Sequence, residues 1–355
     1  MKIRENPALC FDDVLLAPKF FPGKSRRDID ISTTLAGLKL GTPFICANMS
    51  FCEDLLCDRL GEMESTGIIH RNNSPDEQYE IVKRFLKRRA DEEDDGCFGG
   101  GYSWAFGVAV GLNDWKERLI KIVGKIQRCL VVLDVAHADQ QQYWDAVDKI
   151  IKEYDSDIHL CLGTFCGRPE RGGHLWGNPN ICWRVSQGGG SVCETRIATG
   201  CGVPTLQAIF DITGNGMPAG GVISDGGIKN AGDCVKSLAA GASACMMGRL
   251  FAGCNESLGA TVKDGKTGKT YKAYVGNASA AGKTQANSSI DYIEGVEALV
   301  ETSGPVADVI RRLEQGVRSG MSYCGAMNIK ELQENAEFIK ISNAGMRESV
   351  PHVLL

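Results

Sequence analysis

The feature that most constrains the fold of this 355-residue chain is a repeated alternation of short apolar segments with stretches of helical length. The apolar segments are continuous runs, as expected of strands that are covered on both faces. There are eight of them, at residues 43–47, 67–70, 104–110, 130–134, 158–162, 182–185, 221–225 and 244–248. Helical patterns between them include residues 53–64, 75–89, 114–126, 140–153 and 231–239. Eight strand–helix repeats predict an α/β fold, a (β/α)8 TIM barrel that forms one catalytic domain over residues 1–355.

An open, doubly wound sheet would show the same alternation. However, no Gly-x-Gly-x-x-Gly motif opens the first helix, as the dinucleotide-binding version of that fold requires. The longest apolar runs are far shorter than the roughly 18 residues of a membrane span. Residues 1–6 carry charge where a secretory signal has its apolar centre. We therefore expect a cytoplasmic protein without a membrane partner.

Charge and cysteine spacing exclude two further classes of function. The net charge of −5, from 39 basic and 44 acidic residues, offers no general attraction for nucleic acid. The fifteen cysteines are scattered singly, without a Cys-x-x-Cys pair. This spacing predicts reduced thiols in a reducing compartment and argues against a structural zinc site.

Two segments lie outside the repeat. Residues 88–102 are charged and then glycine-rich, which predicts a linker between the second helix and the third strand. Residues 261–303 are polar and lack sustained periodicity, so we expect a long mobile loop after the eighth strand. Loops of that length are uncommon unless they are functional. We interpret this segment as an active-site flap within the barrel domain.

In barrels of this kind, catalytic groups lie where the strands end. The predicted strands are followed by Asn48-Met49-Ser50, His70-Arg71-Asn72, Asp134-Val135-Ala136-His137, Gly188–Cys193, Ser224-Asp225-Gly226-Gly227 and Met247-Gly248-Arg249. An aspartate at such a position can accept hydrogen bonds from a ribose diol, and backbone N–H groups near the seventh and eighth strands commonly hold a phosphate. Taken alone, the sequences 224–227 and 247–249 are each equally well explained as a turn with a helix cap.

The densest signal is Gly188-Gly189-Gly190-Ser191-Val192-Cys193-Glu194-Thr195-Arg196. A run of glycines lets the backbone approach a ligand or a cation closely. A cysteine on an irregular loop near polar and basic groups can act as a thiolate nucleophile. The simpler interpretation is that Cys193 is one more buried thiol among fifteen. Its position after three glycines, at the end of a predicted strand, favours the functional interpretation.

At these residues the sequence resembles the family that contains IMP dehydrogenase and GMP reductase. The resemblance extends over nearly the whole chain, and Gly190-Ser191-Val192-Cys193-x-Thr195-Arg196 is its most specific part. Its other segments are Phe11–Pro18, Gly67–His70, Asp134–His137, Thr199–Pro204, Ser224–Ile228 and Ala239–Gly253. Enzymes of this family bond a cysteine to C2 of a purine nucleotide, and the resemblance assigns that role to Cys193.

Three features favour GMP reductase over IMP dehydrogenase. The paired CBS insertion usual in IMP dehydrogenases is absent between the second and third strands, and residues 261–303 contain no Arg-Tyr dyad to activate water. Residues 271–279, followed by 293–295, also look like a bacterial-type GMP reductase flap. The resemblance then implies NADPH-dependent reductive deamination of GMP to IMP and ammonia. The alternatives are an IMP dehydrogenase that forms XMP with NAD, and a catalytically silent nucleotide-binding paralogue.

The resemblance also implies roles for other residues. Thr195 and Glu294 would relay a proton to the leaving amine, and the less favoured alternative for Glu294 is a solvated loop acid. Residues implied to bind the nucleotide are Ser191, Asp225, Gly226, Gly227, Gly248 and Arg249. Those implied to bind the cofactor are Asp134, Ala136 and His137. The carbonyls of Gly188, Gly190 and Cys193 would ligate a monovalent cation such as K⁺, and the assembly would be a homotetramer.

Several positions depart from the family pattern. Positions that differ from the residues usual in the family are Ser50 for aspartate, Gly163-Thr164-Phe165 for Gly-Asn-Val, Gly189 for proline, Thr205 for glutamine and Arg249 for a small residue. Cys166–Pro179 also does not read as the usual fifth helix. We therefore expect changes in base recognition and in the cofactor contacts.

Overall fold

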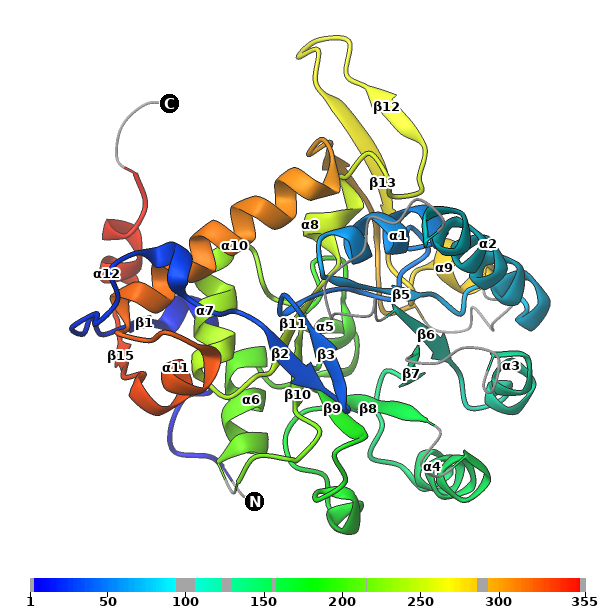
Figure 1. Ribbon diagram of the computed structural model, residues 1–355, viewed down its shortest axis with the longest axis horizontal. Coiled ribbons are helices and arrows are strands. Elements are labelled where there is room, and N and C mark those ends of the chain that lie inside the picture. The colour runs from blue at the N-terminus through cyan, green and yellow to red at the C-terminus, as the bar shows by residue number, and fades with distance from the viewer. Residues whose placement is uncertain are drawn as a thin grey trace.

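The computed structural model describes residues 3–93, 106–122, 129–154, 158–214, 216–285 and 293–351. Its centre is a closed barrel of eight parallel strands in the order β10-β11-β4-β5-β6-β7-β8-β9 (Figure 1). The strands are β4 (Phe44–Cys46), β5 (Thr66–Ile69), β6 (Phe106–Val110), β7 (Cys129–Asp134), β8 (His159–Phe165), β9 (Ile181–Val185), β10 (Val222–Asp225) and β11 (Ala244–Met247). Each predicted apolar segment contains or overlaps one strand. The predicted (β/α)8 barrel is confirmed.

The amino ends of the strands are closed by a hairpin of β2 (Thr33–Leu35) and β3 (Leu38–Leu40). Leu35, Leu38 and Leu40 pack with the inward-facing side chains of the barrel. The hairpin turn is held by the backbone of Ala36, whose N–H donates to Gly220 and whose carbonyl lies 2.7 Å from Nδ1 of His159. This end is therefore filled by apolar side chains, and the opposite end is left for chemistry.

Helices cover the outer face of the barrel (Figure 1). They are α1 (Asp54–Glu62), α2 (Pro75–Glu93), α3 (Trp115–Ile122), α4 (Gln141–Tyr154), α6 (Thr205–Thr213), α7 (Ala231–Ala239), α8 (Arg249–Ala252) and α10 (Val306–Tyr323). The short helix α5 (Thr195–Thr199) follows the loop after β9 and has no buried residue. Smaller elements are η1 (Phe11–Asp13), β1 (Val14–Leu16), η2 (Arg26–Asp28), α11 (Ile329–Asn335), β15 (Phe338–Lys340) and α12 (Asn343–Glu348). No helix in the described ranges is long and apolar enough to span a membrane.

The predicted linker at residues 88–102 is wrong in its first part. Helix α2 continues to Glu93, because Arg, Ala and Glu, which make up most of residues 88–93, are strong helix formers. Residues 94–105 lie outside the described ranges, as does the end of the helix predicted for residues 114–126.

The connection from β8 to β9 departs from the barrel pattern, as the sequence of Cys166–Pro179 indicates. It contains only the short 3-10 helix η4 (Gly173–Leu175). An aromatic cluster of Trp144, Phe165, Trp176 and Trp183 packs there instead, with ring centroids 5.0 to 6.4 Å apart. Gly172 has a left-handed φ of +81°, and a Cβ there would lie 2.4 Å from the Trp144 ring. Glycine is thus required for the chain to pass so close to the cluster.

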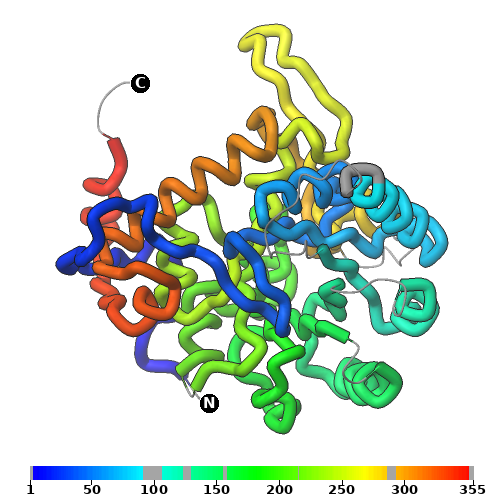
Figure 2. The backbone as a smooth tube through the Cα atoms, in the orientation of Figure 1, coloured from blue at the N-terminus to red at the C-terminus, as the bar shows by residue number. Residues whose placement is uncertain are grey.

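The expectation that residues 261–303 form a loop without regular secondary structure is also wrong. The segment contains a three-stranded antiparallel sheet of β12 (Thr261–Lys263), β13 (Thr270–Val275) and β14 (Glu297–Glu301), together with helix α9 (Ala280–Gln285). The β12–β13 hairpin projects away from the barrel (Figures 1 and 2). We call residues 261–303 the flap.

The flap is fastened to the barrel by two inward-facing residues of β13, Lys272 and Tyr274. The Lys272 ammonium group donates to the carbonyls of Cys254 and Ser257, both at 2.6 Å, and to the carbonyl of Asn255 at 3.1 Å. A lysine at a buried position hides the period-two alternation of the strand, because the charged residue lies on the buried face while the opposite face carries tyrosine, alanine and valine. That is why the strand escapes detection from the sequence.

Candidate active site

A cavity of about 380 Å³ opens at the carboxyl ends of the barrel strands, beneath part of the flap. Strands β4, β5, β7, β8, β9 and β10, or the residues that follow them, contribute to its wall. Nine of the residues predicted from the sequence line this cavity: Asp134, Ala136, Gly188, Gly190, Cys193, Thr195, Asp225, Gly226 and Glu294. Most of the predicted site is therefore brought together in one place.

Five predicted residues do not line the cavity: His137, Ser191, Gly227, Gly248 and Arg249. Ser191 and Arg249 are exposed. Gly248 lies under Tyr274, and a Cβ there would come within 2.6 Å of the tyrosine hydroxyl. His137 faces a neighbouring cleft. Their roles toward a nucleotide or cofactor remain predictions.

Cys193 is half-buried, and its thiol donates a hydrogen bond to the Thr195 hydroxyl across 3.2 Å. Thr195 is the first residue of α5, so the helix fixes the position of that hydroxyl. A cysteine nucleophile is expected to have its thiol at a cavity wall, hydrogen-bonded to a group that can exchange a proton.

The flap pairs directly with the cysteine loop. The Glu194 N–H donates to the Glu294 carbonyl at 2.8 Å, and the Val296 N–H donates to the Val192 carbonyl at 3.0 Å. Cys193 and Gly295 form an antiparallel bridge between these two bonds. This pairing carries Glu294 to the cavity wall beside Cys193, although about 100 residues separate them in the sequence.

The glycines of the cysteine loop are explained by close backbone contacts. Gly226 has a φ of +77°, and a Cβ on it would lie 3.1 Å from the backbone of Gly189 and Gly190. The Gly190 carbonyl accepts the Cys193 N–H at 3.1 Å. Because a carbonyl oxygen has a second lone pair, this bond is compatible with the cation predicted at Gly188, Gly190 and Cys193, which stays a prediction.

The sequence analysis did not identify Arg184, which is buried at the centre of the site. Its guanidinium donates to Asp134 at 2.5 Å and to the Asn48 carboxamide oxygen at 3.2 Å, and it lies 3.6 Å from Asp225. A charged residue inside the apolar strand Ile181–Val185 was the available signal, since a buried charge requires partners.

The pKa values of the two carboxylates that contact Arg184 are shifted in opposite directions. Burial raises the pKa of Asp225, and the proximity of Arg184 only partly offsets this. Burial acts in the same direction on Asp134, but Arg184 and Arg71 hold the pKa of Asp134 below its ordinary value. Asp134 is therefore ionised beside two guanidiniums. At Asp225, the nearby positive charge does not fully offset the cost of burying a carboxylate.

Two buried donors at this site have no hydrogen-bond partner among the described residues: Nδ2 of Asn48 and Nε of Arg184. Buried donors are almost always satisfied, because an unsatisfied donor costs about 1–3 kcal/mol. Both residues line the cavity. A ligand rich in acceptor atoms, such as a nucleotide or a nicotinamide cofactor, fits this donor set.

A carboxamide from the flap joins two strand ends at the same cavity. Asn277 accepts a hydrogen bond from the Asn72 side chain at 2.8 Å and donates to the Asn48 carbonyl at 3.1 Å. The flap backbone beside the cavity is therefore fixed relative to β4 and β5.

The sequence matches the IMP dehydrogenase / GMP reductase domain family over residues 8–352. The chain belongs to this family. Both activities in the family name are oxidoreductions of purine nucleotides, so the family is one of oxidoreductases of purine metabolism. The predicted family resemblance is confirmed.

Relatives of the chain include two proteins named inosine-5′-monophosphate dehydrogenase. The protein from Nitrosopumilus maritimus is 41% identical over 266 residues, which cover 70% of this chain and 54% of the relative. The protein from Borreliella burgdorferi is 30% identical over an alignment that is 401 residues long with its gaps and that covers 97% of this chain and 96% of the relative. The chain thus spans about half the length of the first relative and nearly all of the second. Both names correspond to the alternative considered in the sequence analysis.

Proposed function

We propose that the chain catalyses an oxidoreduction at C2 of a purine nucleotide through a covalent bond to Cys193, and that its main reaction is the oxidation of IMP to XMP with NAD. The observation that supports the chemistry is the Cys193–Thr195 pair at the wall of a cavity that also contains Asp134, Asp225 and Glu294. The names of the relatives favour the oxidative direction over the GMP reduction implied by the sequence resemblance.

In the oxidative reaction, the Cys193 thiolate forms a bond to C2 of IMP, and the hydrogen at C2 departs as hydride. A nicotinamide cofactor bound on the Asp134 side of the cavity would supply the acceptor for that hydride. Water then adds at C2, the C–S bond breaks, and the thiolate is regenerated as XMP is released. The net reaction converts IMP, NAD⁺ and water into XMP, NADH and a proton.

Two residues handle protons in this scheme. Thr195 accepts the hydrogen bond of the thiol and fixes its direction. Glu294 lines the cavity beside the cysteine loop and is the carboxylate that would accept a proton from the attacking water. This assignment supplies a base in a flap that lacks an Arg-Tyr dyad.

The other charged groups position the ligands. Asp225 would accept hydrogen bonds from the ribose hydroxyls of the nucleotide, and Asp134, with Ala136, would lie toward the nicotinamide side. Arg184 links the two carboxylates across the cavity, so it holds both ligand-binding groups at a fixed separation. Side chains that are already held by an ion pair lose little conformational entropy when a ligand binds.

GMP reduction is the second candidate, supported by the absence of an Arg-Tyr pair in residues 261–303. The thiolate would add to C2 of GMP, and Glu294 and Thr195 would protonate the amine that leaves as ammonia. Hydride delivered to C2 by NADPH would then release IMP and regenerate the thiolate.

The deciding experiment is to incubate the full chain with IMP plus NAD and, separately, with GMP plus NADPH, while following the absorbance of the reduced nicotinamide. We expect NADH to accumulate with IMP, with XMP as the product. Consumption of NADPH with GMP alone would establish the reductase instead. Nucleotide binding without turnover in either mixture would contradict both and indicate a silent paralogue.

The proposal includes a K⁺ site at the loop carbonyls and a homotetramer. Replacing K⁺ with Na⁺ in the same assay should lower the rate while leaving nucleotide affinity nearly unchanged. Equal rates in the two salts would remove the cation from the proposal, and light scattering measures the assembly independently.

A further inference from the structure

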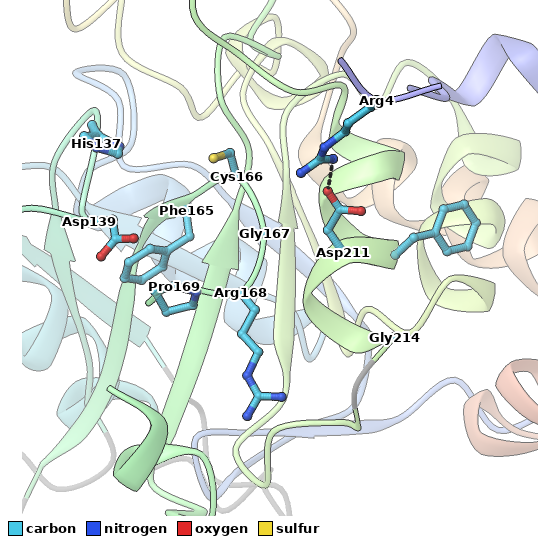
Figure 3. Close-up of a pocket in the computed structure, with 11 residues that line it drawn as sticks. Arg4, His137, Asp139, Phe165, Cys166, Gly167, Arg168, Pro169, Asp211 and Gly214 are labelled. Atoms are coloured by element: carbon cyan, nitrogen blue, oxygen red, sulfur yellow. Dashed lines mark hydrogen bonds and ion pairs between the residues drawn. The ribbon is translucent and has the colours of Figure 1, made fainter. Parts of the chain in front are cut away.

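The loops around the active-site cavity differ in what lies behind them. Beyond β8 the chain borders a cleft of about 490 Å³ on the flank of the barrel (Figure 3). Behind the β5 loop, residues 70–73, lies instead a buried arginine of α3, Arg118, which is only 2% exposed. A charged side chain is almost never buried so deeply unless it is paired. Arg118 does not line the cavity, and the proposed reaction does not use it.

The Arg118 guanidinium makes five hydrogen bonds, as many as it has N–H donors. Its Nε donates to the Asp114 carboxylate at 2.7 Å. One terminal nitrogen donates to the side-chain oxygens of Gln78 at 3.1 Å and Asn73 at 3.4 Å. The other donates to two backbone carbonyls, those of Arg71 at 3.2 Å and Asn73 at 2.6 Å. The planar guanidinium thus joins α3 to α2 and to the β5 loop.

Gln78 of α2 holds the same loop at its first residue. This side chain is fully buried, and its amide nitrogen donates to the carbonyls of His70 at 2.9 Å and Ala109 at 2.8 Å. Its amide oxygen accepts the bond from Arg118. The backbone carbonyls of residues 70, 71 and 73 are therefore all bound by one of these two side chains, which fixes the loop as a unit.

The β5 loop carries two side chains that reach the active site. The Arg71 Nε donates to the Asp134 carboxylate at 3.1 Å. The Asn72 carboxamide donates at 2.8 Å to Asn277 of the flap, the same segment that brings Glu294 to the cavity. A displacement of this loop would therefore disturb a charge partner on one side of the cavity and an attachment point of the flap on the other.

We infer that Arg118 is a positioning residue for the reaction at C2 of the nucleotide. It acts through the backbone of the β5 loop, and it holds Arg71 against Asp134 and Asn72 against the flap. The inference rests on the proposed function, because it concerns the groups assigned there to the nicotinamide side and to the flap. Arg118 itself touches neither the nucleotide nor the reacting atoms.

The first test replaces Arg118 by lysine, which keeps the charge but has three donors and no planar group. We expect kcat to fall at least about tenfold and the KM for NAD to rise, since small displacements far from the chemistry have large effects on rate. The KM for IMP should stay nearly unchanged, because Cys193 and Asp225 lie on other strands and loops. Lys116→Met is the matched control. It removes an exposed charge of the same helix, paired with Glu153, and should keep wild-type kinetics.

A double-mutant cycle separates positioning from a general loss of stability. Asn277→Ala removes the flap partner of Asn72 and is combined with Arg118→Lys. Because both changes act on the same contact, the double variant should lose clearly less kcat than the product of the two single losses, whereas independent effects multiply. Losses that multiply, or a kcat of Arg118→Lys within about twofold of wild type, would overturn the inference. Asp114→Asn, which weakens one of the five bonds, replaces Arg118→Lys in the cycle if the lysine variant does not fold.

Hydrogen exchange gives a result that does not depend on turnover. In Arg118→Lys the amides of residues 70–73 and 276–279 should exchange faster, while those of α10 stay unchanged. Faster exchange throughout the chain would make Arg118 a general stabilising residue and overturn the inference. If the wild type turns over neither substrate pair, the proposed function fails, whereas faster exchange confined to these two segments would still support the connection from Arg118 to the flap.

Discussion

Cys193 differs from most of the other described cysteines in its surroundings. Ten of the fourteen described thiols are buried, whereas Cys193 is half-buried at the wall of a cavity, with the Thr195 hydroxyl as partner. This environment supports reactivity, because a thiol must be both accessible and able to lose its proton.

Cys193→Ser should therefore abolish turnover while leaving nucleotide binding nearly intact, since an alkoxide is far harder to form at neutral pH than a thiolate. We expect less than about 1% of the wild-type kcat, measured from reduced-nicotinamide absorbance, with the nucleotide Kd from calorimetry. Cys201→Ser, which changes an exposed thiol eight residues away, is the control. Activity above a few per cent in Cys193→Ser would contradict a covalent mechanism.

The opposite pKa shifts of Asp134 and Asp225 predict how the free energy of unfolding depends on pH. The folded-state pKa of Asp225 is raised by burial, so the folded chain holds that proton more tightly than the unfolded chain does. Relative to Asp225→Asn, the wild type should lose stability as the pH rises from about 4 through the raised pKa. The pKa of Asp134 is lowered, so its contribution is present above about pH 4 and is lost as the pH falls through the lowered pKa.

The measurement is the urea unfolding free energy of the wild type and the two asparagine variants between about pH 3 and pH 7. The differences from wild type should change with pH in opposite directions for the two positions. If the two differences changed with pH in the same direction, the pKa shifts of Asp134 and Asp225 would not be opposite, and Arg184 would not stabilise one carboxylate more than the other.

At the scale of secondary-structure elements, the attachment of the flap to the barrel can be tested at a single side chain, that of Lys272. Lys272 places its ammonium group among three backbone carbonyls and the Ser257 hydroxyl, between β13 and the segment after α8. Removal of the ammonium group would take this charged donor from all three carbonyls, although the Cys254 carbonyl would still accept from the N–H and the hydroxyl of Ser257.

Lys272→Met should loosen the flap, with a loss of about 2 kcal/mol in the local opening free energy, the magnitude expected when hydrogen bonds to a charged group are lost. Hydrogen exchange by mass spectrometry should show faster exchange of the amides of β13. Lys269→Met serves as control, because Lys269 is an exposed residue near the same strand and forms its ion pair with Glu301, another exposed residue. Equal exchange in the two variants would mean that Lys272 does not anchor the sheet.

The elements also show what could be predicted from sequence. The eight barrel strands were located because strands buried on both faces read as apolar runs. The strand Thr270–Val275 was missed, because Lys272 occupies one of its inward positions. Cys193, Thr195 and Asp225 were placed together by motif, but Arg184 was missed, because only folding brings Asp134 and Asp225 to either side of it.

At the scale of the whole molecule, burial divides the cysteines into groups that differ in accessibility. Cys201 is exposed, and Cys10, Cys166 and Cys193 are half-buried. We expect N-ethylmaleimide to modify these four in the native protein, and the ten buried thiols only after unfolding. Mass spectrometry of digested samples identifies the sites, and bound IMP should protect Cys193 but not Cys201. Early modification of a buried cysteine such as Cys161 would contradict the packing of the barrel core.

The aromatic cluster on the β8–β9 flank determines what an optical probe of this protein reports. Three of the five tryptophans, Trp144, Trp176 and Trp183, lie within that cluster. Intrinsic fluorescence will therefore follow mainly this one side of the barrel, whereas far-ultraviolet circular dichroism averages over all helices. If the flank without a crossover helix opens before the rest, the two unfolding curves will separate, and a single midpoint will no longer describe the protein.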